Sequence, residues 1–205
     1  ITESFEGRGG DDTIDGAGGN DQIRYDNAGA GVSVDLSLGT ASDGDGGTDT
    51  LLNIEAVRGS DHDDTLIGGG ADNGTGERDG IESFEGRSGN DTLNGGGGYD
   101  RADYQNTLAA VNVILGGAAN GTASDGYGGT DTLLSIEGVR GSAYDDTLTG
   151  SNDADQFESF EGREGNDTMD GNGGIDRVDY TRSRDAVTVN LATGTASDGY
   201  GDTDT

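Results

Sequence analysis

Gly7-Arg-Gly-Gly-Asp-Asp12-Thr-Ile14-Asp15 is followed directly by Gly16-Ala-Gly-Gly-Asn-Asp21-Gln-Ile23-Arg24. Both units read G-x-G-G-x-D-x-U-x, where U is Ile, Leu, Val, Met, Phe or Ala. Further nine-residue units that fit this frame start at Gly59, Gly68, Glu77, Gly86, Gly95, Gly162 and Gly171, with others at 44–52, 126–134 and the truncated 199–205. Such strict spacing predicts a repeat architecture in which each unit stacks on its neighbours.

A longer repeat encloses the short one. ESFEGR occurs at 3–8, 82–87 and 158–163, and ASDG-x-G-x-TDT occurs at 41–50, 123–132 and 196–205. The predicted modules are 1–80, 81–157 and 158–205, together forming one continuous solenoid. Because the chain opens and closes inside a repeat, the first module is expected to be truncated at its N-terminal end and the third at its C-terminal end.

Each nonapeptide divides into a turn and a short strand. The glycines of the first six positions allow positive φ and let backbone carbonyls face inward. The eighth residue is expected to point into the core, and the seventh, often Thr, is expected to point outward. The predicted core column contains Ile14, Ile23, Leu66, Phe84, Leu93, Leu148 and Met169.

Composition limits how such a chain can fold. Only 29% of the residues are hydrophobic, 42 are Gly, none is Pro, Cys or Trp, and the formal charge is −30. Low hydrophobicity with high net charge is typical of chains that do not collapse by themselves. Either the chain is disordered, or a cation completes the fold. The abundance of carboxylates beside flexible glycine backbone favours a hard divalent cation, Ca²⁺ above all.

The same composition argues against several functions. An acidic surface repels nucleic acid and anionic lipid, so neither is an expected partner. No apolar run approaches the roughly 20 residues of a membrane helix. His62 is the only histidine, and nothing beside it forms a catalytic triad by proximity. Paired carboxylates occur throughout, so no single pair stands out as catalytic. We expect the chain not to be an enzyme.

The nonapeptide resembles the haemolysin-type calcium-binding repeat of the RTX family, over nearly the whole chain. In its overall organisation the chain resembles the repeat region of a large bacterial RTX adhesin. The resemblance implies an all-β fold, a right-handed parallel β-roll or β-solenoid with two units per coil. It also implies that several Ca²⁺ ions bind, each between a turn and the turn two units later, held by Asp side chains and backbone carbonyls.

The candidate calcium ligands follow from the repeat frame. The alternative for each aspartate is a solvated turn residue that stabilises its own backbone. The aspartates are Asp12, Asp21, Asp64, Asp91, Asp100, Asp146, Asp167 and Asp176, with Asp49, Asp131 and Asp204 as their equivalents in the ASDG blocks. The turn glycines are Gly7, Gly9, Gly16, Gly18, Gly86, Gly95, Gly97, Gly162, Gly171 and Gly173.

Some segments depart from the frame. Asn73 and Glu82 replace the sixth-position Asp, and residues 77–80 lack the leading glycine, so sites in these turns are expected to be weak or empty. Segments 32–36, 111–115 and 187–191 alternate apolar and polar residues as strands do. With the apolar clusters at 51–57 and 133–139, they are expected to form longer solenoid coils.

These patterns predict a structural role. The expected function is a calcium-binding spacer or stalk in a secreted or cell-surface bacterial protein, joined to further copies of the same module. The RTX resemblance implies type I secretion and folding on contact with external calcium. Two alternatives remain: an accessory region of a secreted RTX protease, lipase or epimerase, and a fibre or surface-layer segment that associates through unpaired strands at the solenoid ends.

Overall fold

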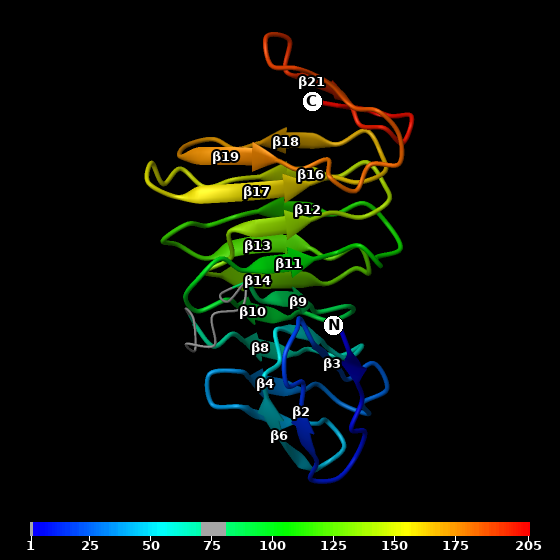
Figure 1. Ribbon diagram of the computed structural model, residues 1–205, viewed down its shortest axis with the longest axis vertical. Helices are drawn as coiled ribbons and strands as arrows, with labels where there is room; N and C mark the ends of the chain where they lie inside the picture. The colour runs from blue at the N-terminus through cyan, green and yellow to red at the C-terminus, as the bar shows by residue number, and fades with distance from the viewer. Residues whose placement is uncertain (1, 71–80) are drawn as a thin grey trace.

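The computed structural model describes residues 2–70 and 81–205, which contain β-strands and no helix (Figure 1). Two sheets run along the long axis of the molecule. Sheet A is entirely parallel and contains, in spatial order, β1 (Ser4–Phe5), β3 (Gln22–Arg24), β7 (Ala56–Arg58), β9 (Ser83–Glu85), β11 (Arg101–Asp103), β15 (Gly138–Arg140), β17 (Phe157–Glu161) and β19 (Ile175–Val178).

Sheet B faces sheet A across the core. Its order is β18 (Thr168–Asp170), β16 (Thr147–Thr149), β12 (Asn112–Ile114), β13 (Gly121–Ser124), β14 (Thr130–Leu134), β10 (Thr92–Asn94), β8 (Thr65–Ile67), β4 (Ser33–Asp35), β5 (Thr40–Ser42), β6 (Thr48–Leu52) and β2 (Thr13–Asp15). A third sheet contains β20 (Thr188–Asn190), β21 (Thr195–Ser197) and β22 (Thr203–Asp204).

The nonapeptides form the predicted β-roll. Successive units alternate between the two sheets, so the strands of one sheet are joined through the other and can pair in parallel. Phe5 pairs with Ile23 and Phe84 with Ala102, a step of two units. Other coils are longer: Leu66 pairs with Leu93 and Leu148 with Met169. The all-β parallel solenoid expected from the repeat is confirmed.

The segments between the nonapeptide runs differ from the expectation. Instead of longer parallel coils, they form antiparallel three-stranded meanders, β4–β5–β6, β12–β13–β14 and β20–β21–β22. The reason is the short connections between these strands, since antiparallel neighbours can be joined by a few residues whereas parallel neighbours need a crossover. Gly39, with φ of 64°, turns the chain between β4 and β5. Each of the first two meanders lies within sheet B, between parallel strands.

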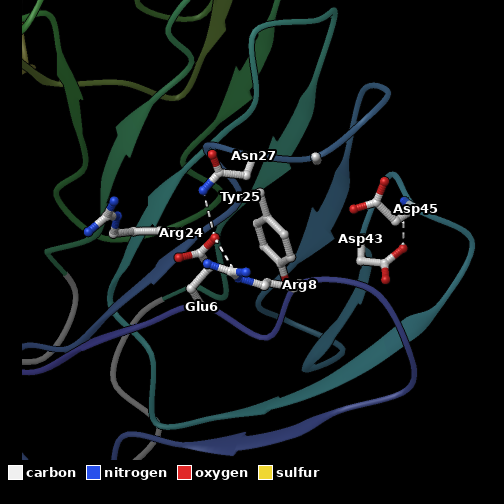
Figure 2. A pocket seen from close by; sticks show the side chains of 8 residues that line it. Glu6, Arg8, Arg24, Tyr25, Asn27, Asp43 and Asp45 are labelled. Carbon is white, nitrogen blue, oxygen red and sulfur yellow. Dashed lines mark hydrogen bonds and ion pairs between the residues drawn. The ribbon is translucent and has the colours of Figure 1, made fainter.

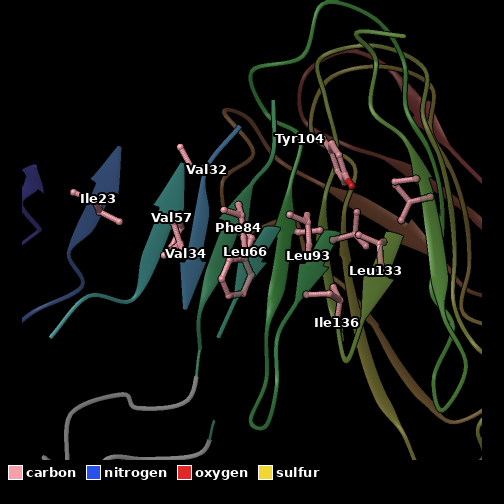
Figure 3. Close-up of a cluster of buried hydrophobic side chains, with 14 of the residues drawn as sticks. Ile23, Val32, Val34, Val57, Leu66, Phe84, Leu93, Tyr104, Leu133 and Ile136 are labelled. Atoms are coloured by element: carbon pink, nitrogen blue, oxygen red, sulfur yellow. The ribbon is translucent and has the colours of Figure 1, made fainter. Parts of the chain in front are cut away.

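The core is a single column of side chains between the sheets (Figure 3). Ile23, Leu66, Phe84, Leu93 and Leu148 are completely buried, as predicted, while Met169 is only partly covered. The meanders add Val34 and Val113, and the apolar clusters that follow them add Val57, Leu133 and Ile136. Thr13, Thr65, Thr92, Thr147 and Thr168 are exposed or half-buried, as outward-facing residues should be. The thinness of this column limits the hydrophobic stabilisation of each coil.

Arginine and acidic residues pair on the outer side of sheet A. Arg140, although only 3% exposed, lies 2.8 Å from Asp103 and 2.9 Å from Glu161. Arg58 lies 3.4 Å from both Asp26 and Glu85. These ion pairs offset part of the negative charge outside the core, but they do not reach the aspartates of the turns.

The C-terminal end of the stack exposes apolar side chains. Val189 in β20 is 51% exposed, whereas its counterparts Val34 and Val113 are fully buried, and Leu191 is 92% exposed, whereas its counterpart Leu115 is buried. The difference arises because β4 and β12 each have a parallel neighbour, β8 and β16. Among the described residues, β20 pairs only with β21.

Candidate metal centres

Carboxylates form a ladder along each column of turns. In the turns that lead into sheet B, the Asp64 N–H donates to Asp91 Oδ1 at 2.8 Å, and the Asp91 N–H donates to Asp131 Oδ1 at 3.1 Å. The Asp146, Asp167 and Asp204 turns repeat this arrangement at 2.9 and 3.1 Å. One oxygen of each accepting aspartate therefore fixes the spacing between neighbouring turns.

The turns that lead into sheet A alternate Asp with Glu. The Glu82 N–H donates to Asp100 Oδ1 at 3.0 Å, and the Asp100 N–H donates to Glu137 Oε2 at 3.0 Å. Asp21 occupies the same position in the first module, between the Glu3 N–H and the Glu55 carboxylate. Both columns of turns thus have one carboxylate per coil.

The second oxygen of four candidate aspartates is buried without a hydrogen-bond partner among the described residues. These oxygens are Oδ2 of Asp21, Asp91, Asp100 and Asp167, in side chains at most 1% exposed. An ionised oxygen buried in this way is costly unless a donor or a cation compensates it. Four candidates predicted from the repeat frame thus have the chemistry that Ca²⁺ requires.

The first-position glycine of each turn leaves room for that oxygen. A Cβ atom at Gly86 or Gly162 would overlap Oδ2 of Asp91 or Asp167. At Gly95 the added atom would overlap both Asp100 Oδ2 and the carbonyl oxygen of Ser135 in the next turn. Gly16 has the same surroundings, with Asp21 Oδ2 at 3.0 Å and the Asn53 carbonyl oxygen. Carboxylate and carbonyl oxygens from neighbouring turns therefore converge, and these are the ligands that Ca²⁺ prefers.

The remaining candidates lie in different surroundings. Asp64 and Asp146 accept hydrogen bonds on both oxygens, the former from Ser60 and the Val32 N–H and the latter from Ser142 and the Val111 N–H. Asp12 is half-buried and Asp176 is exposed. Of the candidate glycines, Gly7, Gly16, Gly95 and Gly171 also face their own sixth-position Asp, whereas Gly9, Gly18 and Gly173 do not.

Three tyrosines bind the aspartates of the ASDG blocks. Tyr104 OH donates to Asp131 Oδ2 at 3.0 Å, while Asp131 Oδ1 accepts the Asp91 N–H. The same bonds join Tyr25 to Asp49 and Tyr180 to Asp204, each at 2.9 Å. Asp49, Asp131 and Asp204 therefore have both oxygens hydrogen-bonded within the protein.

Removing the tyrosine hydroxyl should destabilise the calcium-bound fold. In Tyr104→Phe, Asp131 Oδ2 stays buried but loses its donor, so we expect a loss of about 1–3 kcal/mol in the free energy of unfolding. Denaturant unfolding in saturating calcium measures this loss. Tyr144→Phe, at a ring 46% exposed, is the matched control and should leave the unfolding free energy nearly unchanged. Equal stability of the two variants would contradict a supporting role for the Tyr104 hydroxyl.

Of the glutamates in the sheet A turns, the nonapeptide frame identified only Glu82, as a replacement for the sixth-position Asp, and it did not identify Glu55, Glu137 or Glu158. Glu82 accepts the Gly69 N–H at 2.9 Å, and the fully buried Glu158 accepts the Ser151 N–H at 2.9 Å. Glu55 and Glu137 bind the N–H groups of Asp21 and Asp100. The signal for these glutamates was their recurrence, as the Ile-Glu pair within each apolar cluster and as the first residue of ESFEGR. Asn73 and residues 77–80, expected to weaken their turns, lie outside the described residues.

Burial also changes the acidity of the candidate aspartates. Desolvation raises the pKa of Asp91 and of Asp100 to about 8, and neighbouring carboxylates add to the effect. Desolvation likewise raises the pKa of Asp131 and of Asp167 to about 7. Without a cation, the ionised carboxylates therefore oppose folding at neutral pH.

Acidification should favour the metal-free fold. Because these pKa values are higher in the folded chain than the ordinary value of about 3.9, protonation stabilises folding. That stabilisation is complete below pH ~4 and disappears as the pH rises through about 7 to 8. We expect the β signal in far-UV circular dichroism, in resin-treated calcium-free buffer, to increase from pH 8 to pH 4.5. A decrease over this range would contradict the assignment of these groups as buried carboxylates.

A hollow of about 290 Å³ beside the first meander has a different character (Figure 2). Glu6, on its wall, accepts a hydrogen bond from Asn27 at 2.7 Å and pairs with Arg8 at 3.5 Å. Figure 2 places Asp43 and Asp45 across from this group, with Tyr25 between them.

In residues 2–70 and 81–205, no three Asp, Glu or His side chains gather so as to hold a metal ion by themselves. The turn sites described above combine carboxylates with backbone carbonyls.

Comparison with protein families identifies the repeat. The family of the RTX calcium-binding nonapeptide repeat matches residues 2–27, 78–103, 139–159 and 159–178. The chain contains calcium-binding RTX nonapeptide repeats. The matched residues of this RTX region contain seven of the candidate aspartates, Asp12, Asp21, Asp91, Asp100, Asp146, Asp167 and Asp176. The ASDG blocks lie outside the matches.

Two further findings are negative. Comparison with curated proteins gives no significant match. Within residues 2–70 and 81–205, no helix has the length and apolarity needed to cross a membrane.

Proposed function

We propose that this RTX repeat region is a calcium-rigidified, non-catalytic spacer of a secreted or surface-attached bacterial protein. The observation that supports this role best is the unbroken pairing of sheet A from β1 to β19. Pairing continues across the predicted module boundaries, from β7 to β9 and from β15 to β17. A stack of this kind transmits its stiffness along its length, because each coil is bonded to the next.

Calcium supplies the condition for this stiffness. A ligand that binds only the folded chain stabilises it by mass action at every site. At the low calcium level of a cytoplasm the buried carboxylates would keep the chain open, as secretion through a narrow channel requires. At the higher calcium level outside the cell the turns would close. The spacer would therefore become rigid only at its place of use.

Small-angle X-ray scattering tests the spacer role directly. With millimolar calcium we expect a rod whose cross-section is that of two sheets, and in chelator an expanded, flexible chain. A compact, roughly spherical particle in calcium would contradict the spacer. Joining two copies of the region in tandem is the sharper experiment, since a spacer should then double the length of the rod at constant cross-section.

The exposed apolar residues of β20 favour association with an adjoining copy of the module. Val189 and Leu191 are exposed in the third meander, whereas the equivalent strands of the preceding meanders, β4 and β12, pair with β8 and β16. An edge strand with an uncovered apolar side invites pairing with another chain. Sedimentation velocity in calcium should reveal concentration-dependent growth, which Leu191→Asp should suppress. A monomer at all concentrations would leave the spacer without this self-association.

A further inference from the structure

The loop between the second and third strands of each meander is organised by one aspartate. Asp125 Oδ1 accepts three backbone N–H groups, from Tyr127, Gly128 and Gly129, at 2.8 to 2.9 Å. Asp198 Oδ1 accepts the N–H groups of the corresponding residues of the third copy at 2.9 to 3.2 Å. These bonds fix the carboxylates in place.

The other oxygen of both aspartates has no donor. Asp125 and Asp198 are 0% exposed, and their Oδ2 atoms find no hydrogen-bond partner among the described residues. A fully buried carboxylate with one unsatisfied oxygen is as costly here as in the nonapeptide turns. Neither residue belongs to the sixth position of the repeat, and neither lies in the segments matched by the RTX family.

The Gly89 carbonyl oxygen of the neighbouring nonapeptide turn lies close to Asp125 Oδ2. A Cβ atom at Gly129 would meet Asp125 Oδ2 at 2.8 Å and would overlap the Gly89 carbonyl oxygen, so both oxygens lie over this glycine. Thr132 donates its N–H to the Asp91 carbonyl at 2.7 Å, which holds the two turns together. Asp91 Oδ2 in the same turn is also buried and without a partner. The negative charge of Asp125 is among the causes that raise the pKa of Asp91.

The sixth-position aspartates of these blocks, Asp131 and Asp204, already accept hydrogen bonds on both oxygens. Asp131 accepts hydrogen bonds from Tyr104 OH and from the Asp91 N–H, and Asp204 accepts the equivalent bonds from Tyr180 and Asp167. The unsatisfied oxygens in these loops belong to Asp125 and Asp198. In these loops, the buried oxygen without a donor therefore belongs to the loop aspartate and not to the sixth-position aspartate of the repeat.

We propose that Asp125 and Asp198 each contribute a carboxylate to an additional site for a hard divalent cation, Ca²⁺, which Asp91 and the Gly89 carbonyl complete in the second copy. These sites join the meanders to the nonapeptide coils. The inference rests on the proposed function only in the identity of the cation.

The first copy lacks such a site. Asp43 Oδ2 accepts the Gly10 N–H at 3.1 Å, so both of its oxygens have donors. Its nonapeptide neighbour Asp12 is half-buried rather than buried. The protein therefore has two sites of this kind rather than three.

Counting bound ions distinguishes the loop aspartate from the frame aspartate. Asp125→Asn keeps an oxygen for the three N–H groups but replaces the ligand oxygen, whereas Asp131→Asn removes the same charge and can still bond Tyr104 and the Asp91 N–H. Equilibrium dialysis against saturating Ca²⁺ should give one ion fewer per chain for Asp125→Asn and no change for Asp131→Asn. An unchanged count in Asp125→Asn, or a loss confined to Asp131→Asn, overturns the proposal.

Asp198→Asn provides a second, independent count. It lies in the last meander, where misfolding would leave the preceding coils intact, and should also lose one ion. Circular dichroism in saturating calcium verifies that each variant folds. A wild-type chain that does not respond to calcium would refute the proposed function, whereas a responsive wild type with unchanged counts in both variants would refute this inference alone.

Discussion

Withdrawal of calcium is expected to unfold nearly the entire chain. The reason is the combination of a core one side chain thick with buried, unpartnered carboxylate oxygens at Asp21, Asp91, Asp100 and Asp167. Without a cation, these charges repel one another, and no bond compensates the desolvation of their Oδ2 atoms. Far-UV circular dichroism should show little ordered structure in chelator and a cooperative gain of β signal during a calcium titration.

Magnesium is the control for this titration. It requires near-octahedral geometry and gives up its water reluctantly, so turns built from carbonyls and single carboxylates should respond to it only weakly. Cooperativity is expected because each ion joins two turns and prepares the next site. A metal-free chain that is already compact and rich in sheet, with no further change on adding calcium, would contradict the role assigned to the ion.

Substituting Asp91 and Asp100 together by Asn should produce opposite effects with and without calcium. Asn can still accept the Asp64 and Glu82 N–H groups through its oxygen, but it lacks the second carboxylate oxygen. In a calcium titration the folding midpoint should rise by at least about tenfold, equivalent to ~1.4 kcal/mol. In chelator the same variant should be less disordered than the wild type, because two buried charges are gone.

Asp155→Asn with Asp185→Asn is the matched control, since both side chains are exposed. It removes the same formal charge from the surface, where salt screens it, and should leave the midpoint within about twofold of the wild type. If the two double variants shift the midpoint equally, the effect is one of net charge, and Asp91 and Asp100 lose their assignment as ligands.

The short repeat made much of the fold predictable. Position eight identified Ile23, Leu66, Phe84, Leu93 and Leu148 as core residues, and each is completely buried. Their environment is determined locally, because every unit has the same turn and the same partner one coil away. The meanders were harder to predict. Segments such as 32–36 alternate like any strand, and a single strand does not reveal whether its partner runs parallel or antiparallel.

The candidate sites show the same division. The frame placed Asp91 and Asp100 in the turns, but it treated Asp131 as their equivalent. Tyr104, distant in sequence, takes that carboxylate by a hydrogen bond. Asp125, outside the frame, is instead left with a buried free oxygen. Which carboxylate lacks a donor depends on contacts between separate coils, and no spacing along the chain encodes it.

The sequence by itself determined that this chain folds as a repeat and that its turns bring carboxylates and glycine backbone together, and it predicts that apolar contact is too scarce to hold the fold without a cation. These properties are local, so nine residues suffice to specify them. Only the tertiary structure decided the direction of the meander strands, the pairing of tyrosines with the ASDG aspartates and the carboxylate oxygens that stay unsatisfied. Each of these depends on which coil lies beside which, and that is settled only when the sheets pair.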